Sequence, residues 1–125
     1  MEAAILNLEG DLLYNQEKYE EALEKIQQAI DTCPEDKIED LNVYKNNMAL
    51  CYIKLAVRCG TDKNFEDAKY FYTKAHLMLI ACYLSDKTYE EDLKQVEAAI
   101  FHNYGRQLQY QGKYEEALNE YRQAL

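Results

Sequence analysis

One eight-residue segment occurs twice, with a single difference, in this chain of 125 residues. This internal repeat limits the possible folds more than any other feature. Gln-Glu-Lys-Tyr-Glu-Glu-Ala-Leu at 16–23 returns as Gln-Gly-Lys-Tyr-Glu-Glu-Ala-Leu at 111–118, and a glycine precedes each copy, Gly10 or Gly105. One supersecondary unit has therefore been used more than once. Because units of this size cannot bury their own apolar face, the repeat predicts stacked units that share a continuous core.

Helical periodicity runs through the chain, and no segment alternates as a β-strand does. Breaks in the periodicity predict six helices, at about 2–14, 19–30, 36–58, 65–84, 88–111 and 114–125. Asn64 is expected to cap the start of the fourth helix, and Gly60 to end the third. Thr88 and Glu91 have the spacing of a capping box, and Pro34 is expected at the start of the third helix.

Apolar residues at helical spacing predict which faces of the first two helices are buried. One stripe contains Ala4, Ile5, Leu8, Leu12 and Leu13, and the next contains Tyr19, Ala22, Leu23, Ile26, Ala29 and Ile30. The polar segment 15–18 between them is short enough for a tight helix hairpin. Six helices in three such hairpins predict an all-α solenoid rather than a closed bundle, in a single domain.

Composition limits the possible partners and chemistry. The net charge is −9, which disfavours nucleic acid and anionic membranes, because both require a basic face. The cysteines form no metal-like spacing with His76 or His102, so we expect no metal, and reduced, packed thiols in a cytoplasmic protein. No phosphate loop, nucleophile–base arrangement or cofactor motif is present, so we expect a protein that is not an enzyme and binds no cofactor.

The small and aromatic residues of the hairpins resemble the tetratricopeptide repeat. The first hairpin carries Gly10, Tyr19, Ala22, Ala29 and Pro34; the second carries 47–52, Ala68, Tyr72 and Ala75; the third carries Phe101, Tyr104, Gly105, Gly112, Tyr114, Ala117, Tyr121 and Ala124. The resemblance implies a right-handed superhelical α-solenoid with repeats at 2–34, 36–84 and 88–125.

The spacing between repeats departs from the family. Ala22 and Ala68 are 46 residues apart, and Ala68 and Ala117 are 49 apart, against a usual period of about 34. The chain is therefore similar to the long-repeat branch that includes kinesin light chains and spindle-orientation adaptors. Because the chain stops within its last helix, we expect a third repeat truncated at the C-terminus, in a fragment of a longer protein or with its end covered by a partner or a second copy.

The resemblance also implies that the first helix of each hairpin lines a concave groove that binds a peptide or helix of another protein. The groove residues are then Asn7, Asp11 and Tyr14, then Asn46, Asn47, Leu50, Ile53 and Lys54, then Ala99, His102, Asn103, Arg106 and Tyr110. Asparagine amides can bond a partner's backbone, and exposed tyrosines can anchor it.

One subclass of the family binds the acidic C-terminal tails of chaperones through a two-carboxylate clamp. The corresponding positions here are Asn7, Asp11, Asn47, Ala99 and Asn103. Only Asn47 matches the clamp, and Asp11 would repel a carboxylate, so chaperone tails are disfavoured. The function expected is therefore a non-catalytic interaction scaffold. The alternatives are a peptide-sensing regulatory domain of a larger protein, or a structural module that self-associates through its C-terminal end.

Overall fold

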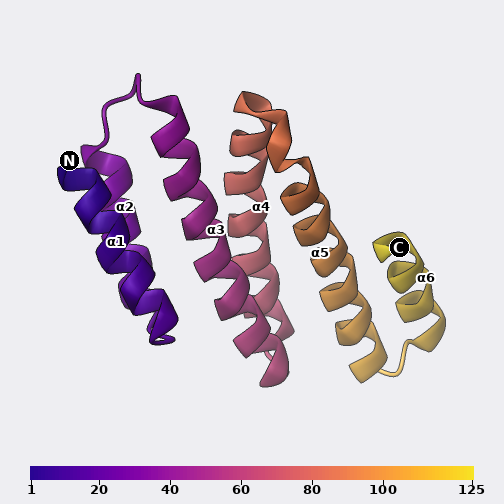
Figure 1. Ribbon diagram of the computed structural model, residues 1–125. Coiled ribbons are helices and arrows are strands. Elements are labelled where there is room, and N and C mark those ends of the chain that lie inside the picture. The colour runs from indigo at the N-terminus through magenta and orange to yellow at the C-terminus, as the bar shows by residue number, and fades with distance from the viewer.

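Six α-helices lie side by side in the order of the sequence (Figure 1). The structure, a computed structural model, describes all residues from Met1 to Leu125. The helices are α1 (Glu2–Asn15), α2 (Tyr19–Thr32), α3 (Ile38–Thr61), α4 (Phe65–Ser85), α5 (Glu90–Tyr110) and α6 (Tyr114–Ala124), with a short 3-10 helix, η1 (Lys87–Tyr89), before α5. The chain is therefore an all-α solenoid, and the prediction of its fold class is confirmed.

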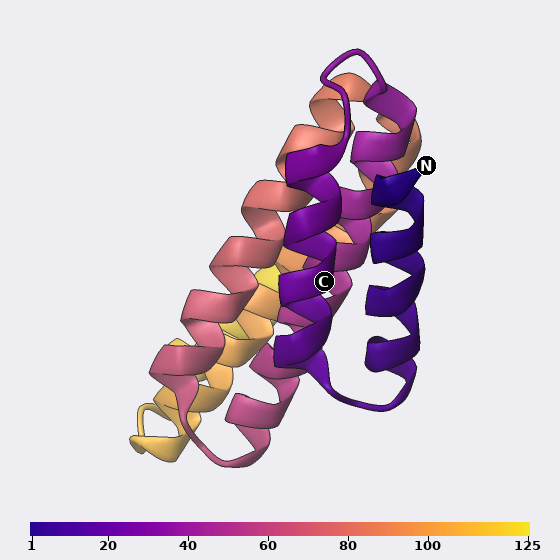
Figure 2. The ribbon, with the colours of Figure 1, turned by 90° about the vertical axis from the view of Figure 1, so that its left-hand side faces the viewer.

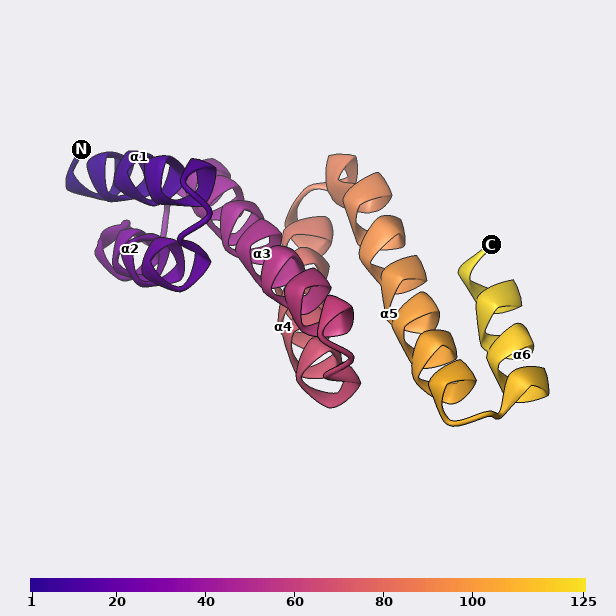
Figure 3. The same ribbon diagram turned by 90° about the horizontal axis from the view of Figure 1, so that it is seen from below.

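The helices pair into three antiparallel hairpins that follow one another along the solenoid (Figure 3). The hairpins are α1–α2, α3–α4 and α5–α6, and they stack through α2 on α3 and through α4 on α5. Seen from the first hairpin, the longer helices α3 and α4 lie behind it at a tilt (Figure 2). The three hairpins therefore give a stack with two internal junctions, α2–α3 and α4–α5.

The same turn closes each hairpin. One residue of each turn adopts a positive φ, namely Glu17, Lys63 and Gly112. The amide of the residue that follows donates a hydrogen bond back into the first helix, for example from Lys18 to the Leu13 carbonyl at 2.9 Å. This is the six-residue closure typical of helix C-termini. The three hairpins therefore share one type of turn.

Glycine lets the helices of the first and third hairpins approach closely. A Cβ atom on Gly10 would lie 2.7 Å from Cγ1 of Ile26, and one on Gly105 would lie 2.6 Å from the ring of Tyr121. The sequences support this equivalence, because Glu-Ala-Ala-Ile at 2–5 also returns at 97–100. The repeat detected in the sequence therefore corresponds to the same packing in space.

The core is built largely from small side chains where helices cross. One buried cluster joins the first hairpin to α3, and includes Ala22, Ile26, Ala29, Tyr44, Met48 and Cys51. A second joins α3, α4 and α5, and includes Ala49, Ala56, Ala68, Ala75, Leu79 and Val96. Alanine at a crossing brings two backbones together, while the larger residues fill the space beside it. Continuous burial from one hairpin to the next is what the internal repeat predicts.

Most of the apolar stripe predicted for the first helix is exposed, and of its residues only Leu13 packs against the core. Ile5, Leu8 and Leu12 are between 52% and 62% exposed, and α1 buries Ala3 and Gly10 instead. Periodicity identified an apolar face correctly, but it could not indicate whether another helix covers that face. Because α1 packs mainly against α2, the stripe that turns away from α2 remains in contact with solvent.

Three predicted helix ends also differ from the structure, whereas the Asn64 cap is confirmed by a hydrogen bond from the Asp67 amide at 3.3 Å. Gly60 lies inside α3. Pro34 lies before α3, in the turn that leads into it. Thr88 does not cap α5. Its amide and hydroxyl instead donate to the Asp86 carboxylate, which begins η1.

An ion pair bridges the α2–α3 junction. Nη2 of Arg58 donates to Oε2 of Glu20 at 2.8 Å. The same guanidinium lies over the Tyr19 ring, 5.8 Å from its centroid. The hydrogen bond from Arg58 holds the pKa of the Glu20 carboxyl below its usual value of 4.5.

Glu20→Gln is expected to lower the thermal midpoint of unfolding at neutral pH and to lose this effect in acid. Because the pKa of Glu20 is depressed in the folded protein, the pair stabilises the fold above the unfolded-state pKa, and this contribution is lost as the pH falls through the folded-state pKa. Both side chains are largely exposed, so the effect is at most about 1 kcal/mol. Circular dichroism measures the midpoints, with the exposed and unpaired Glu21→Gln as control. Equal effects of the two substitutions at neutral pH would contradict the prediction.

Candidate peptide-binding groove

A groove lies in the middle of the solenoid, between the facing sides of α3 and α5, and reaches the end of α1. It encloses about 280 Å³, and we call it the central groove. Its lining consists of Tyr14 from α1, Asn46, Leu50, Ile53 and Lys54 from α3, Leu79 from α4, and Asp92, Gln95, Val96 and Ala99 from α5. The α3 and α5 residues recur at three- and four-residue spacing, so each helix turns one face to the groove.

The central groove has an apolar floor and a polar rim. Leu50 is 41% exposed although it lies within the groove, and Ile53 is half-buried beside it. Side-chain amides come from Asn46 and Gln95 on the rim. Such a surface can hold an apolar side chain and bond the backbone next to it.

The rim charges are of both signs. Lys54 is an exposed cation, whereas Asp92 faces the groove from α5. Asp11 lies in a small adjoining hollow of about 30 Å³ that also contains Tyr14 and Asn47. The surroundings therefore suit a ligand of mixed or basic character better than a purely acidic one.

An amide pair connects the first two hairpins at the edge of this region. Nδ2 of Asn47 donates to Oδ1 of Asn7 at 3.0 Å, and both side chains are half-buried. The Tyr14 ring meets the Tyr19 ring edge-on, with 5.4 Å between centroids. Partial burial raises the pKa of the Tyr14 hydroxyl, which therefore remains protonated at neutral pH and can donate to a ligand.

The predicted residues from the C-terminal half of α5 do not join the central groove. Asn103 is 5% exposed, and its Nδ2 donates to the Phe65 carbonyl at 3.3 Å. Arg106 donates to the Gly60 carbonyl at 3.3 Å. Tyr110 packs against the Phe65 ring at 5.9 Å between centroids. All three contacts join the third hairpin to the second.

His102 also lies apart from the central groove. Its ring is exposed and lies 5.3 Å from the ring of Tyr121 on α6. Arg106 and Tyr110 line a different hollow, of about 380 Å³, near the turn between α5 and α6. The structure therefore brings together the predicted residues of α1, those of α3 and Ala99, and separates them from His102, Asn103, Arg106 and Tyr110.

Sequence reasoning missed Asp92, Gln95 and Val96, which line the groove from the N-terminal half of α5. The family pattern was matched at the C-terminal half of this helix, because Gly105 and the following turn carry the repeat. A signal was present, since these residues share one helix face with Ala99.

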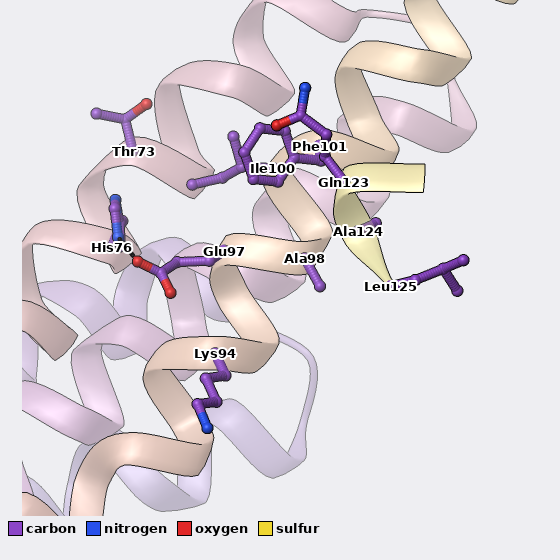
Figure 4. A pocket seen from close by; sticks show the side chains of 10 residues that line it. All are labelled: Thr73, His76, Lys94, Glu97, Ala98, Ile100, Phe101, Gln123, Ala124 and Leu125. Carbon is purple, nitrogen blue, oxygen red and sulfur yellow. Dashed lines mark hydrogen bonds and ion pairs between the residues drawn. The ribbon is translucent and has the colours of Figure 1, made fainter. Parts of the chain in front are cut away.

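The largest hollow, about 580 Å³, lies elsewhere, between α4, α5 and the end of α6 (Figure 4). There His76 and Glu97 point toward one another, with Nε2 and Oε2 3.2 Å apart. Ile100 and Phe101 contribute apolar surface, and Leu125 lies at its edge. None of the predicted groove residues lines this hollow.

The cysteines are mostly packed, as the sequence predicts. Cys33, Cys51 and Cys82 are buried and Cys59 is half-buried. Burial raises the pKa of the Cys51 thiol to about 12, so this sulfur is protonated at neutral pH and is a poor nucleophile. None of the six helices has the length and apolar character needed to span a bilayer.

Antiparallel hairpins that stack through alternate helices define the chain as a helical-repeat protein of the α-solenoid class. Within this class, residues 3–36 match the family model of the tetratricopeptide repeat. The match covers the first hairpin and reaches just past Pro34. No curated protein and no solved structure matches the chain significantly. Tetratricopeptide repeats generally mediate protein–protein interactions and are generally not catalytic.

Proposed function

We propose that the protein is a non-catalytic scaffold whose central groove binds a peptide or a helix of a partner protein. The observation that carries the proposal is the exposure of Leu50 within a groove lined by three first helices. Its place in the groove matters more than its exposure alone, because an apolar centre surrounded by amides and charges is the usual arrangement of a protein interface.

The charges around the groove support a partner of particular chemistry. An apolar residue of the partner contacts Leu50 and Ile53, and Asn46 and Gln95 bond its backbone. Lys54 attracts an acidic side chain, whereas Asp11 and Asp92 repel one. The occupant is therefore a segment with an apolar anchor and charges of both signs, or with net basic character. The pair of aspartates is also a physical reason why a purely acidic tail is a poor ligand.

Leu50→Glu is expected to weaken partner binding at least about tenfold, because it places a charge at the apolar anchor. The partner is first captured with the wild-type protein and identified by mass spectrometry. Its dissociation constant is then measured by calorimetry for wild type, for Leu50→Glu and for Lys54→Glu. If the variants unfold at the same midpoint as the wild type, the substitutions have changed binding and not folding.

Leu77→Glu is the matched control. Leu77 is 54% exposed on α4 and lies outside the central groove, so the same charge there should leave the affinity unchanged. If the partner binds Leu50→Glu as tightly as it binds the Leu77 variant, the central groove is not its site and the proposal is wrong.

A further inference from the structure

The second helix of every hairpin begins with the same pair of residues, an aromatic residue followed by a glutamate. The pairs are Tyr19-Glu20 in α2, Phe65-Glu66 in α4 and Tyr114-Glu115 in α6. Each pair follows directly after a turn of identical geometry, so it occupies the same place in its hairpin. What contacts these pairs in the first two hairpins indicates what the third can bind.

Both internal junctions use the pair in the same way. At the α2–α3 junction, Arg58 lies over Tyr19 and donates to Glu20 at 2.8 Å. At the α4–α5 junction, two neighbouring residues of α5 share these contacts. The Arg106 guanidinium lies 5.7 Å from the centroid of Phe65. Nε2 of the next residue, Gln107, donates to Glu66 Oε1 at 2.8 Å.

The two junctions thus obey one rule, in which the incoming helix brings a guanidinium to the aromatic ring and a hydrogen-bond donor to the glutamate. A guanidinium above an aromatic ring is attracted by the ring's electron density. A charged donor to a carboxylate makes one of the stronger hydrogen bonds. Together, the two contacts favour an arginine at this place.

The third pair carries no helix. Tyr114 is 68% exposed, and Glu115 makes no ion pair. Leu118 is 49% exposed, whereas its counterpart Leu23 is half-buried and packs against the core cluster that joins α2 to α3. The same face of the same repeated helix is therefore covered in the first hairpin and free in the third.

We propose that this face of α6 docks an amphipathic helix of a partner protein that carries an arginine, and that the guanidinium lies on Tyr114 and bonds to Glu115. The partner helix also carries apolar residues seven and ten positions before its arginine, and these cover Leu118 and the end of α6. In α3, Cys51 and Met48 have the same spacing from Arg58 and belong to the core cluster. This surface is separate from the central groove and extends the proposed function to a second binding site.

A second copy of this chain fits the surface less well. The first helix of another copy would have to supply the donor from the position that Arg58 and Gln107 occupy, five residues before the positive-φ residue of the turn. In α1 this position is Leu12, which has no donor. Apolar contact alone would leave Glu115 covered and unpaired, which costs free energy.

The helix α3 provides the probe for a test, because it already docks on such a pair. A synthetic peptide with the sequence 38–61 is titrated into the protein, and the dissociation constant is measured by fluorescence anisotropy. We expect Glu115→Arg to weaken binding at least about fivefold, because attraction is replaced by repulsion. Glu116→Arg is the matched control, since it makes the same charge change in the same exposed turn of α6 and should bind like wild type.

A charge exchange makes the test specific. The peptide with Arg58→Glu should bind wild-type protein weakly and bind the Glu115→Arg protein with most of the original affinity. No binding of the wild-type peptide, equal affinities of the Glu115 and Glu116 variants, or no recovery in the exchanged pair would each overturn the proposal. Sedimentation is the last measurement. A dimer that forms in the wild type and is lost in Glu115→Arg would also overturn the proposal, because a second copy of the chain would then occupy this face of α6.

Discussion

Leu79→Ala is expected to lower the free energy of unfolding by about 2–5 kcal/mol. Leu79 is 1% exposed and lies in the cluster that joins α3, α4 and α5, which also contains Val96 and Ala75. Truncation removes apolar contacts and leaves a void under the central groove that the packed helices cannot close. Chemical denaturation monitored by circular dichroism measures the change.

Leu77→Ala is the matched control, because it deletes the same atoms from the same helix where the side chain is 54% exposed. Its effect should remain within about 0.5 kcal/mol. If the two substitutions destabilise the protein equally, α4 does not present these faces to core and solvent as described, and the order of the stack is wrong.

Ala22→Leu is expected to cost about 1–3 kcal/mol, for the opposite physical reason. Ala22 is fully buried, and its carbonyl oxygen lies 3.3 Å from where a Cβ of Gly10 would be. Three additional carbon atoms have no space unless α1 and α2 separate. Ala117 lies at the equivalent place in the third hairpin and is 2% exposed, so Ala117→Leu should have a similar effect.

The control for overpacking is Ala4→Leu, an identical change on the exposed face of α1, which should alter the stability by less than about 0.5 kcal/mol. The unfolding midpoints of the Ala22→Leu, Ala117→Leu and Ala4→Leu proteins are compared with that of the wild type. A stable Ala22→Leu protein would show that the first hairpin is looser than its glycine and alanine contacts indicate.

The stack could be predicted because its determinants are local. Breaks in helical periodicity located all six helices, since a tight turn must interrupt the apolar pattern. Gly10 and Gly105, which belong to the repeat pattern, lie where the helices of their hairpins approach closely. Helix ends were less predictable. Gly60 and Thr88 have suitable chemistry, but α3 continues to Thr61, and Thr88 donates to Asp86 instead of capping α5.

The central groove could be predicted only in part. Asn46, Leu50 and Lys54 were identified because the resemblance implies that the first helix of each hairpin lines the groove, and α3 does turn this face to it. Arg106 and Asn103 were assigned to it because they follow the family pattern on α5. In the structure, that half of α5 packs against the second hairpin, so both side chains make contacts between repeats.

By itself, the sequence determined the helices, the hairpins and their repetition, because turn chemistry and apolar spacing act over a few residues. Only the tertiary structure decided which helix faces are covered. Ile5 and Leu8 belong to an apolar stripe as regular as any in the core, yet they are exposed. The pair Tyr114-Glu115 has the same sequence and the same place in its hairpin as Tyr19-Glu20, yet no helix packs against it. Burial depends on which helix arrives from elsewhere in the chain, and a local pattern holds no information about that neighbour.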